Sequence, residues 1–181
     1  FRRPLTAGEL KSRLDAADTA TKLSGNFYTG IRYSLTTLLS APDFLFRAEM
    51  AVPKGKEYTL DGYSRAARLS YMLWDTTPDQ ELLNAAKAGA LDSDAGVAAQ
   101  AARLMASPRL ETGMRTFFAD FLELDTLGVI TKDPTIYPKY SDEVSSASRE
   151  ETLRTVVDLT LTRNGDFRDI LTTRKTFINR P

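Results

Sequence analysis

The chain has 181 residues, in which 24 Lys and Arg residues balance 24 Asp and Glu residues. The formal net charge of zero excludes a global electrostatic field that would attract nucleic acid or an anionic membrane. The absence of Cys and His excludes disulfides, thiolate metal sites and covalent attachment of a c-type haem, and it removes the usual general base and zinc ligand. No run of about 18 apolar residues is present, so no membrane-spanning helix is expected.

Helix signals begin close to the first residue. Thr6 and Glu9 have the spacing of a capping box, in which each side chain binds a free backbone amide of the other residue. A helix is therefore expected from this box to about residue 24. A second helix is expected over 26–39, because apolar residues recur there at helical spacing. This helix should end just before Pro42, because Pro disfavours a helical conformation of the residue that precedes it.

The next segment is ambiguous from sequence. Residues 43–50 are too few for their periodicity to separate a helical turn from an extended segment, and we expect a helical turn that runs into a loop. Lys and Gly residues over 53–58 favour that loop. Further helix starts are marked by Thr59 or Asp61 as a cap, by Pro78 and by Pro108, since Pro is favoured at the first helical position. The expected helices cover about 61–74, 78–88, 94–105 and 108–122.

The last of these four helices carries the strongest apolar face in the chain. Because its large side chains recur at helical spacing, we expect the helix to be central to the core. The residues of this face are Leu110, Met114, Phe117, Phe118, Phe121 and Leu122.

From residue 123 to 140 the periodicity breaks, and Gly128, Pro134 and Pro138 predict a long ordered loop. A long helix should follow and end at Asn164. These elements together predict an all-α fold, an irregular multi-helix bundle of about seven helices with one long ordered loop. Five aromatic residues could line a sugar-binding groove, but their helical spacing favours core positions. They are Tyr28, Tyr33, Tyr63, Tyr71 and Trp74.

The charged residues fall into three groups. Arg149, Glu150, Glu151 and Arg154 have the spacing of ion pairs on one helix face, which favours a solvated surface. The alternative is that Glu150 or Glu151 pairs with a cation of another helix and ties the two helices together. The cations considered for that role are Arg65 and Arg68.

The second group, Arg47 and Glu49, adjoins Phe44 and Phe46, and is expected at the rim of the core or in an internal pair. The third group is Asp120, Glu123 and Asp125, which could bind a hard cation or act as an acid/base pair. An oxygen cage for a metal normally uses a dedicated loop with Asp, Asn and Gly at short spacing, so surface carboxylates are favoured and no metal site is assigned.

Six phrases, in this order, resemble the planctomycete-type domains of unknown function found in large secreted proteins with cytochrome c modules. By this resemblance, residues 1–50 are the end of a preceding helical domain packed on the next, 58–176 are the main helical domain, and 177–181 start a following segment. The phrases are FRRPLT at 1–6, SAPDFLFRAE at 40–49, LSYMLW at 69–74, PDQELL at 78–83, REET at 149–152 and TFIN at 176–179.

The resemblance implies a periplasmic or extracellular bacterial protein near electron transfer, with no cofactor in this chain and haem in a flanking module or partner. Its partners would be other domains or subunits of a larger assembly, including a c-type cytochrome. The leading hypothesis is therefore a structural or interaction module. The alternative is a carboxylate-dependent enzyme domain acting on a polymeric or carbohydrate substrate, with Asp120, Glu123, Glu150 and Glu151 as candidate catalytic residues.

Overall fold

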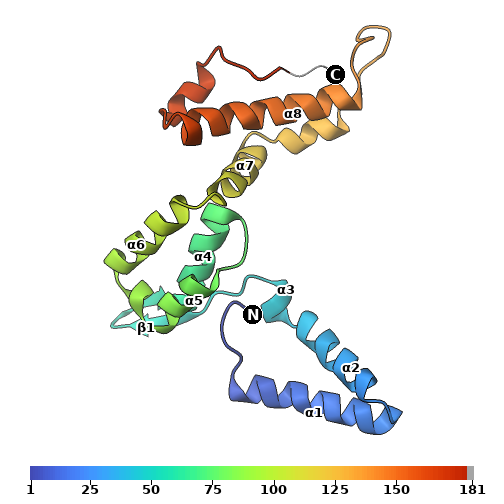
Figure 1. The fold of residues 1–181 in the computed structure, drawn as a ribbon, viewed down its shortest axis with the longest axis vertical. Coiled ribbons are helices and arrows are strands. Elements are labelled where there is room, and N and C mark those ends of the chain that lie inside the picture. Colours follow the sequence, from blue (N-terminus) through green and yellow to red (C-terminus); the bar gives the residue numbers. More distant parts are fainter. Residues whose placement is uncertain (179–181) are drawn as a thin grey trace. The chain divides into compact units, whose positions relative to one another are not determined.

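The computed structural model describes residues 1–178, and their secondary structure is helical apart from one small hairpin of strands (Figure 1). The predicted all-α multi-helix fold is confirmed. In chain order the elements are α1 (Ala7–Ser24), α2 (Phe27–Leu39), α3 (Pro42–Leu45), β1 (Ala51–Lys54), β2 (Glu57–Leu60), α4 (Gly62–Trp74), α5 (Gln80–Lys87), η1 (Ala90–Asp92), α6 (Asp94–Met105), α7 (Leu110–Phe121), η2 (Leu124–Val129), α8 (Asp142–Val157), η3 (Asp158–Thr162) and η4 (Phe167–Leu171).

The two strands correct the expectation of a loop over residues 53–58. β1 and β2 pair antiparallel, with Lys54 opposite Glu57 and Val52 opposite Thr59. The two residues between the strands include Gly55, whose φ of 65° lies in the left-handed region that short hairpin turns require. The Lys- and Gly-rich composition that suggested a loop thus belongs to the turn of a hairpin.

The chain divides into two compact units, Phe1–Ser70 with Thr77–Ala101, and Tyr71–Thr76 with Ala102–Pro181. Helices α4 and α6 each contribute residues to both units. The division of the sequence into 1–50, 58–176 and 177–181 rests on resemblance and stays a prediction. Residues 179–181 of its last part lie outside the described residues.

In the first unit, α1 and α2 lie side by side as a helical hairpin (Figure 1). The predicted capping box starts α1, with the Glu9 carboxylate accepting from the Thr6 amide at 2.7 Å and the Thr6 hydroxyl accepting from the Glu9 amide at 3.2 Å. The helices approach closely at Gly30, where a β-carbon would lie 2.5 Å from the carbonyl oxygen of Ala17. Gly30 is nevertheless the only buried residue of α2, and α1 has none.

The remainder of the first unit packs around small and aliphatic side chains. Ala66, Leu82 and Leu91 are fully buried there. Asp61 caps α4 by accepting from the Ser64 amide at 2.7 Å. The guanidinium group of Arg65 donates to the carbonyl oxygen of Leu91 at 2.5 Å and so joins α4 to η1.

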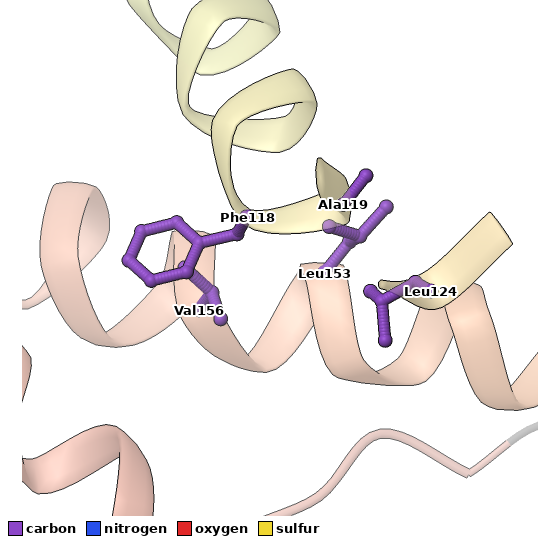
Figure 2. Close-up of a cluster of buried hydrophobic side chains, with 5 residues drawn as sticks. All are labelled: Phe118, Ala119, Leu124, Leu153 and Val156. Carbon is purple, nitrogen blue, oxygen red and sulfur yellow. The ribbon is translucent and has the colours of Figure 1, made fainter. Parts of the chain in front are cut away.

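The core of the second unit lies where α7 and η2 meet α8 (Figure 2). Phe118 and Ala119 of α7 pack with Leu124 against Leu153 and Val156 of α8. The last two residues are 2% and 1% exposed.

Trp74, only 3% exposed, donates from Nε1 to the carbonyl oxygen of Leu104 at 2.9 Å, which satisfies both groups. The core position expected for this residue is therefore confirmed. Tyr28 and Tyr33 were expected in the core as well, but they are 80% and 54% exposed, so that prediction is wrong for them.

The apolar face expected to make α7 central to the core is only half buried. Phe118 is 7% exposed, but Phe117 and Phe121 are 57% and 67% exposed. The expectation was wrong for these two residues because α8 covers one side of a wide apolar arc. The predicted long loop is also shorter than expected, since η2 occupies residues 124–129.

Candidate interaction surface

The apolar residues of α2 form the largest row of exposed hydrophobic side chains in the first unit. Phe27, Ile31, Leu35 and Leu39 follow one another at intervals of four, so they lie along one face of the helix. They are 65%, 42%, 53% and 53% exposed, respectively. We call this row the α2 stripe. Its pattern is that of a core face, but no contact within the first unit buries it.

A second exposed apolar area lies in the other unit, in a groove of about 470 Å³. We call it the Met72 groove. The residues that matter for its chemistry are Met72, Asp75, Phe117, Asp120, Asp125 and Arg149. Met72 is 78% exposed, and Phe117 stacks on Phe121 with ring centroids 5.8 Å apart and planes 7° apart. The groove therefore presents a flexible thioether and a pair of stacked rings.

A close backbone approach positions these side chains. Gly113 of α7 is buried, and a β-carbon there would lie 2.2 Å from the carbonyl oxygen of Leu73. Only a residue without a side chain allows α7 to pack directly on the end of α4. This contact brings Met72 and Asp75 to the same groove as Phe117.

The charges of the Met72 groove are unbalanced. Asp125 accepts hydrogen bonds from Arg149 at 3.1 Å, so these two charges neutralise each other. Asp75, which has a positive φ of 52°, accepts only from the neutral hydroxyl of Thr116, at 3.0 Å. Asp120 is exposed and has no hydrogen-bond or ion-pair partner for its carboxylate among the described residues. Within residues 1–178, neither of these two carboxylates forms an ion pair.

Glu150 is the centre of a set of ion pairs. Arg115 of α7 donates to its two carboxylate oxygens at 3.0 and 3.2 Å, and Arg154 donates at 2.7 Å from the next turn of α8. The hydrogen bonds from Arg115, and then those from Arg154, lower the pKa of Glu150. Glu150 therefore pairs with a cation of another helix, as one hypothesis from sequence proposed. The cation is Arg115 and not Arg65 or Arg68.

Of the remaining candidate carboxylates, Glu151 lines a pocket of about 150 Å³ together with Glu150 and Arg154, whereas Asp120 and Glu123 do not. Glu151 accepts from the hydroxyl of Thr176, which holds the extended tail against α8. Glu123 is exposed and has a positive φ of 51° at the start of η2. Of the four candidate catalytic residues, Asp120 alone lines the Met72 groove.

The candidate ion-pair residues of the first unit also make specific contacts. Arg68 binds Glu49 with two hydrogen bonds of 2.8 and 2.7 Å, and this contact lowers the pKa of Glu49. Arg47 is exposed and lowers the same pKa further through its charge. Arg65 binds the hydroxyl of Thr59 as well as Leu91.

Sequence reasoning did not identify Met72, Asp75 or Arg115. The signal for Arg115 was its spacing of four from Glu111, to which it also donates at 2.9 Å. Over residues 1–178, no group of three or more Asp and Glu side chains is placed to hold a metal ion. Nor does any helix in that range have the length and apolarity needed to cross a membrane.

Two family models match the chain in succession. Residues 60–181 match PSD4, a protein of unknown function (DUF1592). The chain belongs to the DUF1592 family. Ahead of the DUF1592 region, residues 1–49 match PSD5, a protein of unknown function (DUF1595). Both are domains of unknown function of the kind that the sequence phrases resemble. Searches of curated proteins and of solved structures gave no match to this chain.

Proposed function

We propose that this chain is a structural or interaction module of a larger, secreted bacterial protein or assembly linked to cytochrome c electron transfer. The α2 stripe carries the proposal. Its four large apolar side chains keep 42–65% of their surface in contact with solvent. Burying one such side chain fully contributes about 1.5–3 kcal/mol, so another protein segment that covers the stripe would be held strongly.

The helical hairpin itself offers no way to bury the stripe. Its two helices already meet at Gly30, and α1 contributes no buried residue. A two-helix unit with an uncovered apolar face is typical of an element completed by further structure. The expected partner is a neighbouring domain or subunit of the same assembly.

The link to cytochrome c and to secretion is supported by the sequence resemblance. The six phrases resemble domains of large secreted proteins that carry cytochrome c modules, and the DUF1592 and DUF1595 matches agree with the type of domain. Because the 181 residues contain no Cys, a c-type haem of the assembly would be attached to another module or subunit.

The alternative of a carboxylate-dependent enzyme has weaker support. A general acid requires a raised pKa, whereas Arg115 and Arg154 lower that of Glu150. Asp120 and Glu150 belong to different surface features, and only Asp120 lines the groove. The geometry therefore favours a module that binds over one that catalyses.

The proposal can be tested in a bacterium that produces the whole protein containing this chain, with an affinity tag. We expect the purified wild-type protein to come from the periplasmic or extracellular fraction and to carry haem, measured by the absorption of reduced c-type haem per mole of protein. The double variant Ile31→Ser with Leu35→Ser should lower the amount of partner protein that co-purifies with the tagged protein. Leu23→Ser, which changes an 85% exposed residue outside the stripe, is the matched control and should not.

Three outcomes count against parts of the proposal. Purification of the wild-type protein without haem would remove the cytochrome link. Recovery from the cytoplasm would remove secretion. If the double variant co-purifies with as much partner protein as the wild type, the α2 stripe does not hold the assembly together.

A further inference from the structure

The Met72 groove combines exposed apolar side chains with carboxylates, and no contact within its unit covers it. Met72 and Phe117 are 78% and 57% exposed, and Phe121, stacked on Phe117, is 67% exposed. Adaptable thioether and rigid aromatic side chains are the types that protein-binding surfaces favour. An exposed concave patch of this composition marks a place where another polypeptide docks.

The placement of the two carboxylates works against the stability of their own helices. Asp75 follows directly after the last residue of α4, and Asp120 lies in the last turn of α7. The carbonyl end of a helix carries a partial negative charge, which disfavours a carboxylate there and favours a cation. Neither carboxylate forms an ion pair in the part of the chain that the structure describes, and Arg149, which also lines the groove, is paired with Asp125.

The unpaired negative charge of the groove therefore comes from the carboxylates of Asp75 and Asp120, each of which lies at the carbonyl end of a helix. A partner with Lys or Arg side chains around an apolar centre would complement this field, and a partner with Asp or Glu side chains would be repelled. The charge thus selects among the polypeptides that the apolar side chains of the groove could bind.

We propose that the Met72 groove docks a basic, apolar segment of another polypeptide, with its apolar side chains on Met72 and Phe117 and its cations beside Asp75 and Asp120. The proposal goes beyond the function proposed above, because it concerns a second surface and states the chemistry of what binds there. A partner can use the α2 stripe without using the groove, and the reverse also holds.

The probes for the test are two synthetic amphipathic peptides of 14 residues. One is built from Leu and Lys, and the other has Glu in place of every Lys. The protein is the whole 181-residue chain with ¹³C-labelled Met methyl groups. Its four Met residues give four signals, and Met72 is the one that lines the groove. Met50 belongs to the other unit, Met105 does not line the groove, and Met114 packs against the core cluster.

The Lys peptide should shift the Met72 methyl signal selectively and bind at least about tenfold more tightly than the Glu peptide at low salt. That preference should shrink as salt rises, because exposed charges are screened beyond about 10 Å at 0.1 M ionic strength. Asp120→Asn should weaken binding of the Lys peptide by about threefold, as expected for one exposed charge pair. Phe117→Ser should weaken binding of both peptides.

Matched variants separate the groove from general adhesion. Asp133→Asn removes an exposed carboxylate of the same unit outside the groove, and Phe167→Ser removes a 67% exposed ring elsewhere in that unit. Neither should change binding of the Lys peptide. Leu35→Ser in the α2 stripe should not change the Met72 shift either, so failure of this proposal and failure of the proposed function are distinguishable.

Equal affinity for the two peptides would overturn the assignment of a basic partner. Uniform shifts of all four Met signals, or no shift of the Met72 signal, would overturn the groove as the binding place. If Phe117→Ser lowers the melting temperature and weakens binding, the Asp120→Asn variant decides, because its exposed carboxylate takes part in no fold contact among the described residues.

Discussion

Arg115 of α7 and Glu150 of α8 form a two-point ion pair, with nitrogen to oxygen distances of 3.0 and 3.2 Å. The Arg115 side chain is 27% exposed and that of Glu150 is 42% exposed, so the pair is partly shielded from solvent. It is a geometric link between the two helices that build the second unit.

This pair should show measurable coupling in a double-mutant cycle. We expect Arg115→Ala and Glu150→Gln, alone and combined, to give a coupling energy of about 0.5–1 kcal/mol in chemical unfolding, the upper range for partly exposed pairs. The Lys11 and Asp15 pair of α1, with 75% and 62% exposed side chains, is the comparison and should give a few tenths at most. Equal coupling in the two pairs would contradict the role given to Glu150.

The same pair predicts a pH dependence with a definite sign. Since the folded pKa of Glu150 is lowered below its ordinary value of 4.5, its ionised form is stabilised by folding. The contribution is therefore complete above about pH 4.5 and is lost as the pH falls through the folded pKa. The difference in melting temperature between the wild type and Glu150→Gln should be constant from pH 7 to 5 and shrink at lower pH.

Glu9, near the start of the chain, should show a larger lowering of its pKa. Arg3 donates to both Glu9 oxygens, at 2.8 and 3.0 Å, and these bonds, with that from the Thr6 amide, lower the pKa of Glu9 to about 2. An NMR titration of the Glu9 carboxyl carbon should give a midpoint near this value. Arg3→Gln should raise the midpoint but not fully, because the Thr6 bond remains. A wild-type midpoint near 4.5 would show that the contact is absent in solution.

Gly113 should not tolerate a methyl group. A β-carbon there would lie 2.2 Å from the backbone oxygen of Leu73, which cannot move aside as a flexible side chain can. Gly113→Ala should lower the free energy of unfolding by about 1–3 kcal/mol, the usual cost of overpacking. Gly8→Ala, with no atom within 4 Å of the new carbon, should be neutral or stabilising by up to about 1 kcal/mol. A similar loss in both variants would point to a backbone effect instead.

Leu153 should be a major contributor to the stability of the second unit. It is 2% exposed and packs in the cluster of Phe118 and Val156. Leu153→Ala should cost about 2–5 kcal/mol in urea unfolding, because it removes buried methyl groups and leaves a cavity. Leu171→Ala, at a residue that is 88% exposed, serves as the control and should change stability by less than about 0.5 kcal/mol.

The sequence predicted helix positions well where local chemistry determines them. The capping box of Thr6 and Glu9 and the cap at Asp61 are formed, since each requires only residues close in the chain. Pro78 and Pro108 were predicted at the first helical position, but that prediction is wrong, because α5 and α7 begin at Gln80 and Leu110. The strands around Gly55 were missed, although a two-residue turn with Gly between Lys54 and Glu57 was a usable signal.

Burial was harder to predict than secondary structure. At about 100° per residue, the apolar arc of α7 from Phe117 to Leu122 is about 140° wide, more than α8 alone covers. Sequence periodicity locates such an arc but does not say how much of it a neighbour reaches. For the same reason Asp120 could be selected as a candidate residue, whereas Met72 and Asp75 could not, because their meeting with Phe117 depends on the close approach at Gly113.

The sparse burial of the α1–α2 hairpin has a consequence for local unfolding. Amide hydrogens exchange with solvent fastest where few buried contacts oppose opening. With no buried residue in α1 and only Gly30 in α2, the hairpin should exchange long before α8, and proteases should cut it first. Coverage of the α2 stripe by a partner would then slow exchange along both helices, including α1, whose amides lie on the other half of the hairpin.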